Sequence, residues 1–269
     1  MKIAIYFDML KKILITGLLF SSYIASSQAT TVGFFSVTTN NNFFINVGQI
    51  VSDAGLDFEQ LADLNADSLA NIDVLWIANR NNLNPIPDIN TNYTAISNFV
   101  QAGGVLLFQS RLVTDSSSLP GASGISFVRD LNNNGTDVNV LNNTTTVTNG
   151  PAGFIDDTTL DGGNKSSHGY ALLGSLPDNS LSIFSRPDAT EIVDFTYQYG
   201  NGDVYISTIP SDYYIGGTAT PDAFKGIYAP NLVTYAAELS VANVPVPSAV
   251  WFLGTGLLGL LGLNKKKIA

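Results

Sequence analysis

The stretch Asp73-Val-Leu-Trp-Ile-Ala-Asn79 decides the fold, because it is apolar without the alternation expected of a half-exposed strand. Continuous apolar runs of this kind are typical of parallel strands that helices cover on both faces. A second run, Val105-Leu-Leu-Phe-Gln-Ser110, follows it along the chain. Between the two, an apolar stripe at helical spacing over residues 93–100 ends at Gly103-Gly104. This order of strand, helix and strand predicts a mostly parallel sheet with helices on both faces.

The sequence upstream continues the same alternation. It predicts a buried strand at 32–37, a helix at 43–54 that stops at Gly55, and a short strand at 57–61. Together with the two runs above, these elements place the chain in the α/β class.

The sequence downstream changes character. Apolar and aromatic residues alternate over 193–199, and the turn Gly200-Asn-Gly-Asp203 leads into a second strand at 204–209. We therefore expect an added antiparallel β-hairpin. A closing helix is predicted at 231–239, and the polar insertion 131–149 is expected to hold a strand at Thr144–Thr148.

Composition excludes several function classes. Residues 30–243 carry six basic and 21 acidic side chains, a net charge of 6 − 21 = −15, which repels nucleic acid. The chain has no cysteine, which removes thiol nucleophiles, disulfides and cysteine metal sites. Only 13% of residues are charged and 45% are hydrophobic, which is typical of an ordered globular domain.

The N-terminus has the pattern of a secretory signal. Lys11 and Lys12 precede the apolar stretch Ile13–Phe20, which is too short to span a bilayer, and Ser27-Gln28-Ala29 offers small residues to a signal peptidase. We predict that residues 1–29 are removed. Translation could begin at Met1 or at Met9, and the pattern does not distinguish the two.

The C-terminus, residues 244–269, has three parts in a fixed order. The motif Val244-Pro245-Val246-Pro247 comes first, the apolar segment Ala249–Leu263 follows, and Lys265-Lys266-Lys267 closes the tail. Positive charge stays on the cytoplasmic side of a membrane, so the tail predicts a membrane-inserted helix with the central domain outside.

This tail resembles the PEP-CTERM sorting signal, in particular its Val-Pro-Leu-Pro-Ala-Ala-type subclass, with Val246 where the eponymous Glu would stand. The resemblance implies that an exosortase recognises the proline motif and processes the tail, which is either cleaved or retained. It implies export through the inner membrane to the cell envelope, the cell surface or the extracellular matrix. It also implies association with exopolysaccharide.

The central domain, 30–243, resembles class I glutamine-amidotransferase-like and ThuA-like domains, which are flavodoxin-like. The resemblance rests on the two buried runs quoted above, on the helix between them that ends at Gly103-Gly104, and on Gly202-Asp-Val-Tyr-Ile-Ser-Thr-Ile-Pro210. The stretch Leu160-Asp-Gly-Gly-Asn164, with Ser167-His-Gly169, is similar to domains found in PEP-CTERM proteins. Amidotransferases carry a catalytic Cys after a central strand. Here Gln109-Ser110-Arg111 occupies that place, so the resemblance does not extend to that chemistry.

The alternative to a noncatalytic domain is a serine-dependent hydrolase. His168 is the only histidine, so it would have to be the base for Ser110, with Asp194 or Glu191 as the carboxylate. Ser110 lacks the Gly-x-Ser-x-Gly turn that exposes a nucleophile. We therefore expect a noncatalytic domain that binds a ligand or glycan.

Two binding hypotheses remain open. Asp130, Asn132 and Asn134, followed by Gly135, match the first half of a calcium loop, but Leu141 replaces its closing Glu. A polar turn without cofactor is the favoured interpretation; in the calcium alternative, Asp156, Asp157 and Asp161 would complete the site. The second hypothesis is glycan stacking on aromatic side chains, and its candidates are Tyr197, Tyr199, Tyr205, Tyr213 and Tyr214.

Overall fold

The computed structural model describes residues 29–36, 41–79, 87–110, 119–130, 136–163, 166–217 and 219–242. Residues 1–28 of the predicted signal peptide, the sorting motif Val244–Pro247 and the tail lie outside these residues, as do Asn132 and Asn134. Within the described residues, no helix is both long and apolar enough to cross a membrane.

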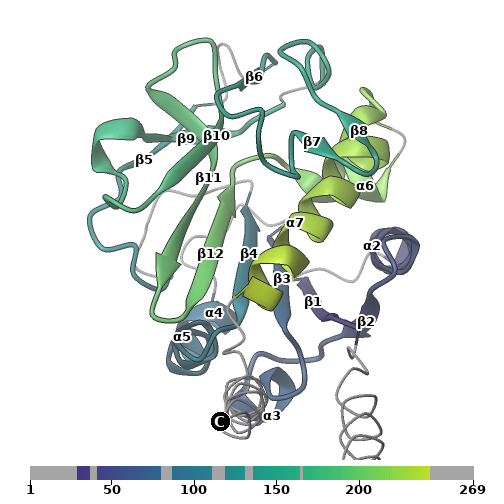
Figure 1. Cartoon of the computed structure of the whole chain (residues 1–269), viewed down its shortest axis with the longest axis vertical. Coiled ribbons are helices and arrows are strands. Elements are labelled where there is room, and N and C mark those ends of the chain that lie inside the picture. Colours follow the sequence, from purple (N-terminus) through teal and green to yellow (C-terminus); the bar gives the residue numbers. More distant parts are fainter. Residues whose placement is uncertain are drawn as a thin grey trace, which may run out of the picture.

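Five parallel strands form the centre of the sheet in the order β2-β1-β3-β4-β12, which is the flavodoxin-like order (Figure 1). Their bounds are β1 (Thr31–Ser36), β2 (Asp57–Gln60), β3 (Val74–Asn79), β4 (Val105–Ser110) and β12 (Gly202–Ser207). The predicted α/β class and parallel sheet are confirmed.

Antiparallel strands extend this sheet beyond β12. The predicted hairpin is confirmed, because β11 (Glu191–Tyr199) pairs antiparallel with β12. The remaining strands of the sheet are β10 (Leu181–Ser185), β6 (Asn139–Val140), β9 (Gly169–Leu172) and β5 (Phe127–Arg129). A separate two-stranded sheet joins β7 (Asn149–Gly150) to β8 (Gly153–Phe154).

Helices cover both faces of the sheet, as predicted. One face carries α2 (Asn41–Asp53), α6 (Ser211–Gly216), a π-helical turn η2 (Phe224–Tyr228) and α7 (Ala229–Ala242). The other face carries α3 (Ala66–Leu69), α4 (Pro87–Thr91) and α5 (Tyr93–Gln101). A short 3-10 turn, η1 (Leu173–Ser175), follows β9.

The two hydrophobic cores explain why β3 is apolar without alternation. Val74 and Trp76 pack in the core on the α2 and α7 face, while Leu75 and Ile77 pack in the core on the α5 face. Trp76 meets Phe34 of β1 edge to face, with ring centroids 5.5 Å apart. Both faces of the strand therefore lie away from water, as the sequence predicted.

The strand predicted at Thr144–Thr148 is wrong. This segment forms turns, since side-chain oxygens compete for the backbone groups that a strand would pair. Asn142 Oδ1 accepts from the Thr144 N–H at 2.9 Å, and Thr148 Oγ1 donates to the Asn142 carbonyl at 2.9 Å.

Candidate functional site

Ser110 and His168, the pair that would serve a hydrolase, reach the same edge of the sheet. Ser110 ends β4, and its neighbour Gln109 pairs in register with Ser207 of β12. His168 donates its backbone N–H to the carbonyl of Thr208, the residue after Ser207, at 3.1 Å. However, Ser110 is only 1% exposed, which does not suit a nucleophile that must meet a substrate.

Asp194, one carboxylate proposed to assist His168, is engaged elsewhere. Its Oδ2 accepts hydrogen bonds from the hydroxyls of Tyr228 at 2.5 Å and Tyr205 at 2.8 Å. Asp194 is fully buried, and burial raises its pKa to about 6 against the opposing effect of hydrogen bonds from Tyr228, Ser207 and Tyr205. Within the described residues, its Oδ1 has no hydrogen-bond partner.

Asp194 belongs to a buried polar network that fills the carboxyl ends of the central strands. Trp76 Nε1 donates to Gln109 Oε1 at 2.8 Å, and Gln109 Nε2 lies 3.4 Å from the Tyr228 hydroxyl. Ser207 Oγ lies 3.1 Å from the same hydroxyl. Among the described residues, the carboxyl ends of β3, β4 and β12 thus carry mutually bonded side chains.

Glu191, the other proposed carboxylate, begins β11 and has structural roles. Its carbonyl accepts the Arg186 N–H at 2.9 Å. Burial raises the pKa of Tyr170, and the Glu191 carboxylate adds to this rise through its charge and a side-chain hydrogen bond.

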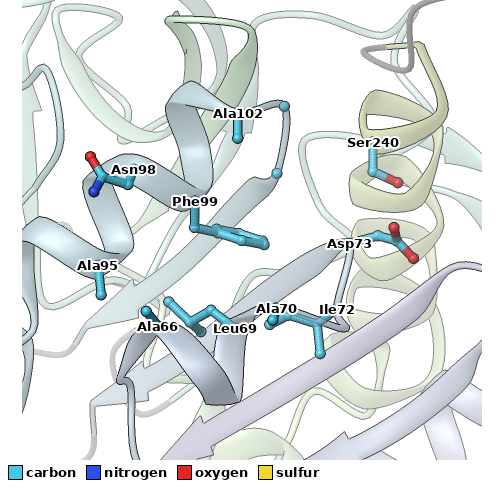
Figure 2. Close-up of a pocket in the computed structure, with 12 residues that line it drawn as sticks. Ala66, Leu69, Ala70, Ile72, Asp73, Ala95, Asn98, Phe99, Ala102 and Ser240 are labelled. Atoms are coloured by element: carbon cyan, nitrogen blue, oxygen red, sulfur yellow. The ribbon is translucent and has the colours of Figure 1, made fainter.

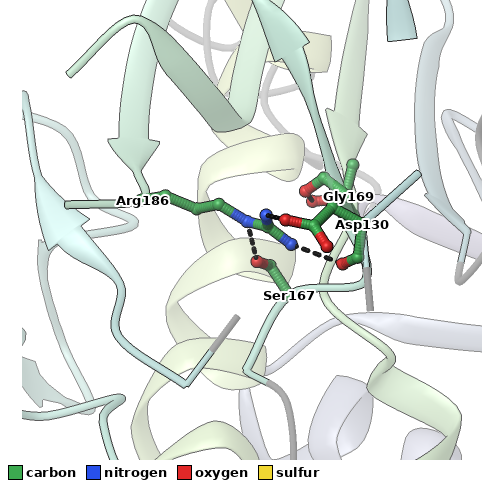
Figure 3. Close-up of polar contacts among 5 residues, drawn as sticks. Asp130, Ser167, Gly169 and Arg186 are labelled. Carbon is green, nitrogen blue, oxygen red and sulfur yellow. Dashed lines mark hydrogen bonds and ion pairs between the residues drawn. The ribbon is translucent and has the colours of Figure 1, made fainter. Parts of the chain in front are cut away.

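Asp130, the first residue of the calcium hypothesis, is paired with a buried arginine (Figure 3). Arg186 Nη1 contacts Asp130 Oδ2 at 3.0 Å, and Nη2 donates to the Asp130 carbonyl at 2.8 Å. Arg186 Nε donates to Ser167 Oγ at 3.0 Å, and the guanidinium lies 5.0 Å from the centre of the Tyr170 ring. A cation at Asp130 would have to displace or tolerate this charge.

The acidic residues offered to complete a calcium site act as backbone acceptors. Asp161 Oδ1 accepts from the Val138 N–H at 2.9 Å, and Asp157 Oδ1 accepts from the Val140 N–H at 2.7 Å. Across the described ranges, no three or more His, Cys, Asp or Glu side chains are grouped to hold a metal ion.

The tyrosines considered for glycan stacking are mostly core residues. Tyr197, Tyr205 and Tyr214 are buried, and the Tyr197 hydroxyl donates to the Pro120 carbonyl at 2.7 Å. Tyr199 is half-buried, and its hydroxyl accepts from Gln101 Nε2 at 2.7 Å. Tyr213 is 40% exposed, whereas its neighbour Tyr214 is buried.

A pocket of about 460 Å³ lies at the opposite, amino edge of the sheet (Figure 2). Apolar side chains from α3, from α5 and from the segment just before β3 line it, including Leu69, Phe99 and Ile72. Asp73 and Ser240 also line it, and Asp73 Oδ2 accepts the Thr31 N–H at 2.8 Å. The start of β1 and the last turn of α7 therefore meet at this edge.

A smaller cavity of about 300 Å³ lies beside the β7–β8 sheet, at the other end of α7. It is lined by Val140, Leu141, Asn143, Phe154, Ile155, Asp156 and Asp157. The sequence reasoning missed this site, although the turn Gly150-Pro-Ala-Gly153 before an isolated Phe is a usable signal.

No family model matches this chain, and no curated protein matches it. Among solved structures, the chain is similar to the exo-β-1,4-mannosidase Op5Man5 from Opitutaceae bacterium strain TAV5, with 10% identity and a TM-score of 0.42. The match covers 80% of this chain and 35% of the mannosidase, so the chain spans about a third of that protein's length. A likeness at this level carries no conclusion about function.

Proposed function

We propose that this chain is an exported protein of the cell envelope whose α/β domain binds a ligand and does not catalyse a reaction. In this proposal a signal peptidase removes residues 1–29, and an exosortase processes the tail 244–269 at Val244–Pro247. The tail holds the protein at the membrane before processing. The mature domain then belongs to the cell surface or the extracellular matrix, in contact with exopolysaccharide.

The meeting of the two ends at the amino edge supports this topology. Thr31, the first residue of β1, bonds to Asp73, and Asp73 shares a pocket with Ser240 near the end of α7. A tail that leaves α7 after Ala242 starts at this edge, so an anchored domain would turn its amino edge toward the membrane. The β5–β9 and β7–β8 pairs lie at the other end, where they would face outward (Figure 1).

The burial of Ser110 at the end of β4 is the observation that carries the noncatalytic part of the proposal. An acyl-transfer enzyme needs an exposed nucleophile, a base and oxyanion donors around an accessible reacting atom. Ser110 is buried, and Gln109 beside it is bonded into the network with Trp76 and Tyr228. The alternative, a hydrolase using Ser110 and His168, is favoured only by their shared position beside Thr208.

The export and sorting proposal is tested by intact-mass measurement on the chain produced in an exosortase-containing bacterium and in its exosortase-deletion strain. We expect a mature protein that begins near Thr30 in both strains. In the parent strain it should also lack the Lys265–Lys267 cluster, whereas the deletion strain and a Pro245→Ala variant should keep the tail. Retention of residues 1–29, or identical tails in all three samples, contradicts the proposal.

A further inference from the structure

The cavity beside the β7–β8 sheet combines an exposed aromatic ring with polar side chains. Phe154 is 55% exposed and Leu141 is 41% exposed, and both line the cavity. Asn143, Asp156 and Asp157 supply the polar part of its lining. An apolar platform beside a few convergent polar groups is the usual composition of a small-ligand site.

The backbone that carries Phe154 is held rigidly. Asn231 of α7 is fully buried, and its Oδ1 accepts the Ala152 N–H at 2.9 Å while its Nδ2 donates to the Gly153 carbonyl at 2.8 Å. The Ile155 N–H donates to the Thr148 carbonyl at 2.8 Å on the other side of Phe154. The ring is therefore presented to solvent from a fixed support, which reduces the ordering that a ligand would require.

The two carboxylates are also fixed, and each keeps one oxygen for a ligand. Asp156 Oδ1 accepts from the Thr158 N–H at 3.0 Å and from the hydroxyls of Thr158 and Thr159 at 2.9 and 2.8 Å. Asp157 Oδ1 accepts from the Val140 N–H. Within the part of the chain that the structure describes, these hydrogen bonds all fall on Oδ1, so Oδ2 of each carboxylate remains an acceptor.

The same hydrogen bonds decide the charge of the site. The Thr159 hydroxyl, followed by the N–H and hydroxyl of Thr158, lowers the pKa of Asp156 to about 2. Asp156 is thus an anion at any physiological pH, and an ionised carboxylate can only accept hydrogen bonds.

We propose that this cavity binds a neutral saccharide, whose apolar C–H face lies on Phe154 and whose hydroxyls donate to Asp156, Asp157 and Asn143. Sugar hydroxyls supply the donors that acceptor-only groups require, and C–H groups complement the negative face of an aromatic ring. Two adjacent carboxylates repel anionic sugars, so uronic-acid polymers are excluded. The proposal names the ligand class of the binding domain proposed above, and its chemistry does not depend on export or sorting.

The direct test is affinity electrophoresis of the full chain in mild detergent, through gels that contain neutral glucan, mannan or galactan, or a polyuronate. We expect retardation by at least one neutral polymer and none by the polyuronate, with no change when EDTA is added. Phe154→Ala should weaken retardation at least tenfold, and Phe154→Tyr should retain it. Ile45→Ala, which truncates an exposed apolar side chain of α2, is the matched control and should bind like the parent chain.

Each contrary result overturns the proposal. These are retardation by none of the neutral polymers, equal binding by Phe154→Ala, equal retardation by the polyuronate, and loss of binding in EDTA, which would assign the carboxylates to a metal ion. Because the test uses unprocessed chain, failure of signal or tail processing in cells would leave its outcome unchanged.

Discussion

Asn231 Nδ2 donates a hydrogen bond to the carbonyl oxygen of Gly153 at 2.8 Å, which ties α7 to a hairpin 78 residues earlier in the chain. Asn231 is buried, so removal of its side chain leaves the Ala152 N–H and the Gly153 carbonyl without their partner. We expect Asn231→Ala to lower the free energy of unfolding by about 2 kcal/mol in urea titration. Asn143→Ala, at an exposed position, should change it by less than about 0.5 kcal/mol. Equal stability of the two variants would contradict a stabilising role for the hydrogen bonds of Asn231 to Ala152 and Gly153.

Asp194 should make stability fall as the pH rises from about 4 to 6. Burial raises its folded-state pKa from 3.8 to about 6, so the folded chain holds a proton that the unfolded chain has released in this interval. The stabilisation is complete below the unfolded pKa and is lost as pH rises through the folded pKa. At about 1.4 kcal/mol per pKa unit the loss amounts to about 3 kcal/mol.

The matched variant for this effect is Asp194→Asn, because its amide cannot titrate and other carboxylates contribute equally to both proteins. The difference in free energy of unfolding between parent and variant, measured by urea denaturation at several pH values, isolates Asp194. We expect the parent to lose stability relative to the variant between pH 4 and pH 6. A difference that does not vary with pH would contradict the raised pKa of Asp194 in the folded chain.

Arg186 should be a major contributor to stability. Its side chain is fully buried and bonds to Asp130 and Ser167, so Arg186→Ala leaves a partly buried carboxylate without its cation. We expect a loss of about 3 kcal/mol in urea denaturation. Arg186→Lys should recover little, because an ammonium cannot reproduce the planar fork. Arg129→Ala, at an exposed position, is the control, and a loss as large there would indicate a general charge effect.

Gly202 should not tolerate a side chain. A Cβ at this position would overlap the carbonyl oxygens of Val100 and Gly104, where the hairpin packs on the end of α5. We expect Gly202→Ala to cost about 3 kcal/mol in thermal or urea unfolding. A Cβ at Gly174 meets no atom within 4 Å, so Gly174→Ala should shift stability by less than about 1 kcal/mol. A similar change in stability for the two variants would contradict the close packing of Gly202 against the carbonyl oxygens of Val100 and Gly104.

The parallel half of the sheet could be predicted because its strands carry their own pattern. Residues 74–78 and 105–108 are buried between helices on both faces of the sheet, and each of these runs is continuously apolar. The short strands β5 and β6 have no such pattern: β6 has two residues, and its pairing with Phe184 and Ser185 depends on the chain far away. Their formation is a tertiary effect that local periodicity does not encode.

The candidate sites were less predictable for the same reason. Asp130 matched the start of a calcium loop, but its observed partner is Arg186, 56 residues later, and no spacing rule links the two. Asp194 was considered as a partner for His168, whereas its Oδ2 accepts hydrogen bonds from the hydroxyls of Tyr205 and Tyr228. The exposure of Phe154 follows from its place on a hairpin that α7 supports, which local sequence does not specify.

The central claim, that this domain binds without catalysing, is tested most directly by labelling of the full chain with a fluorophosphonate probe. The probe bonds covalently to an activated serine, so mass spectrometry of the labelled peptide identifies the residue. We predict no labelling of Ser110, and no difference between the parent chain and His168→Ala. Labelling of Ser110 that disappears in His168→Ala would contradict the account and establish the hydrolase alternative.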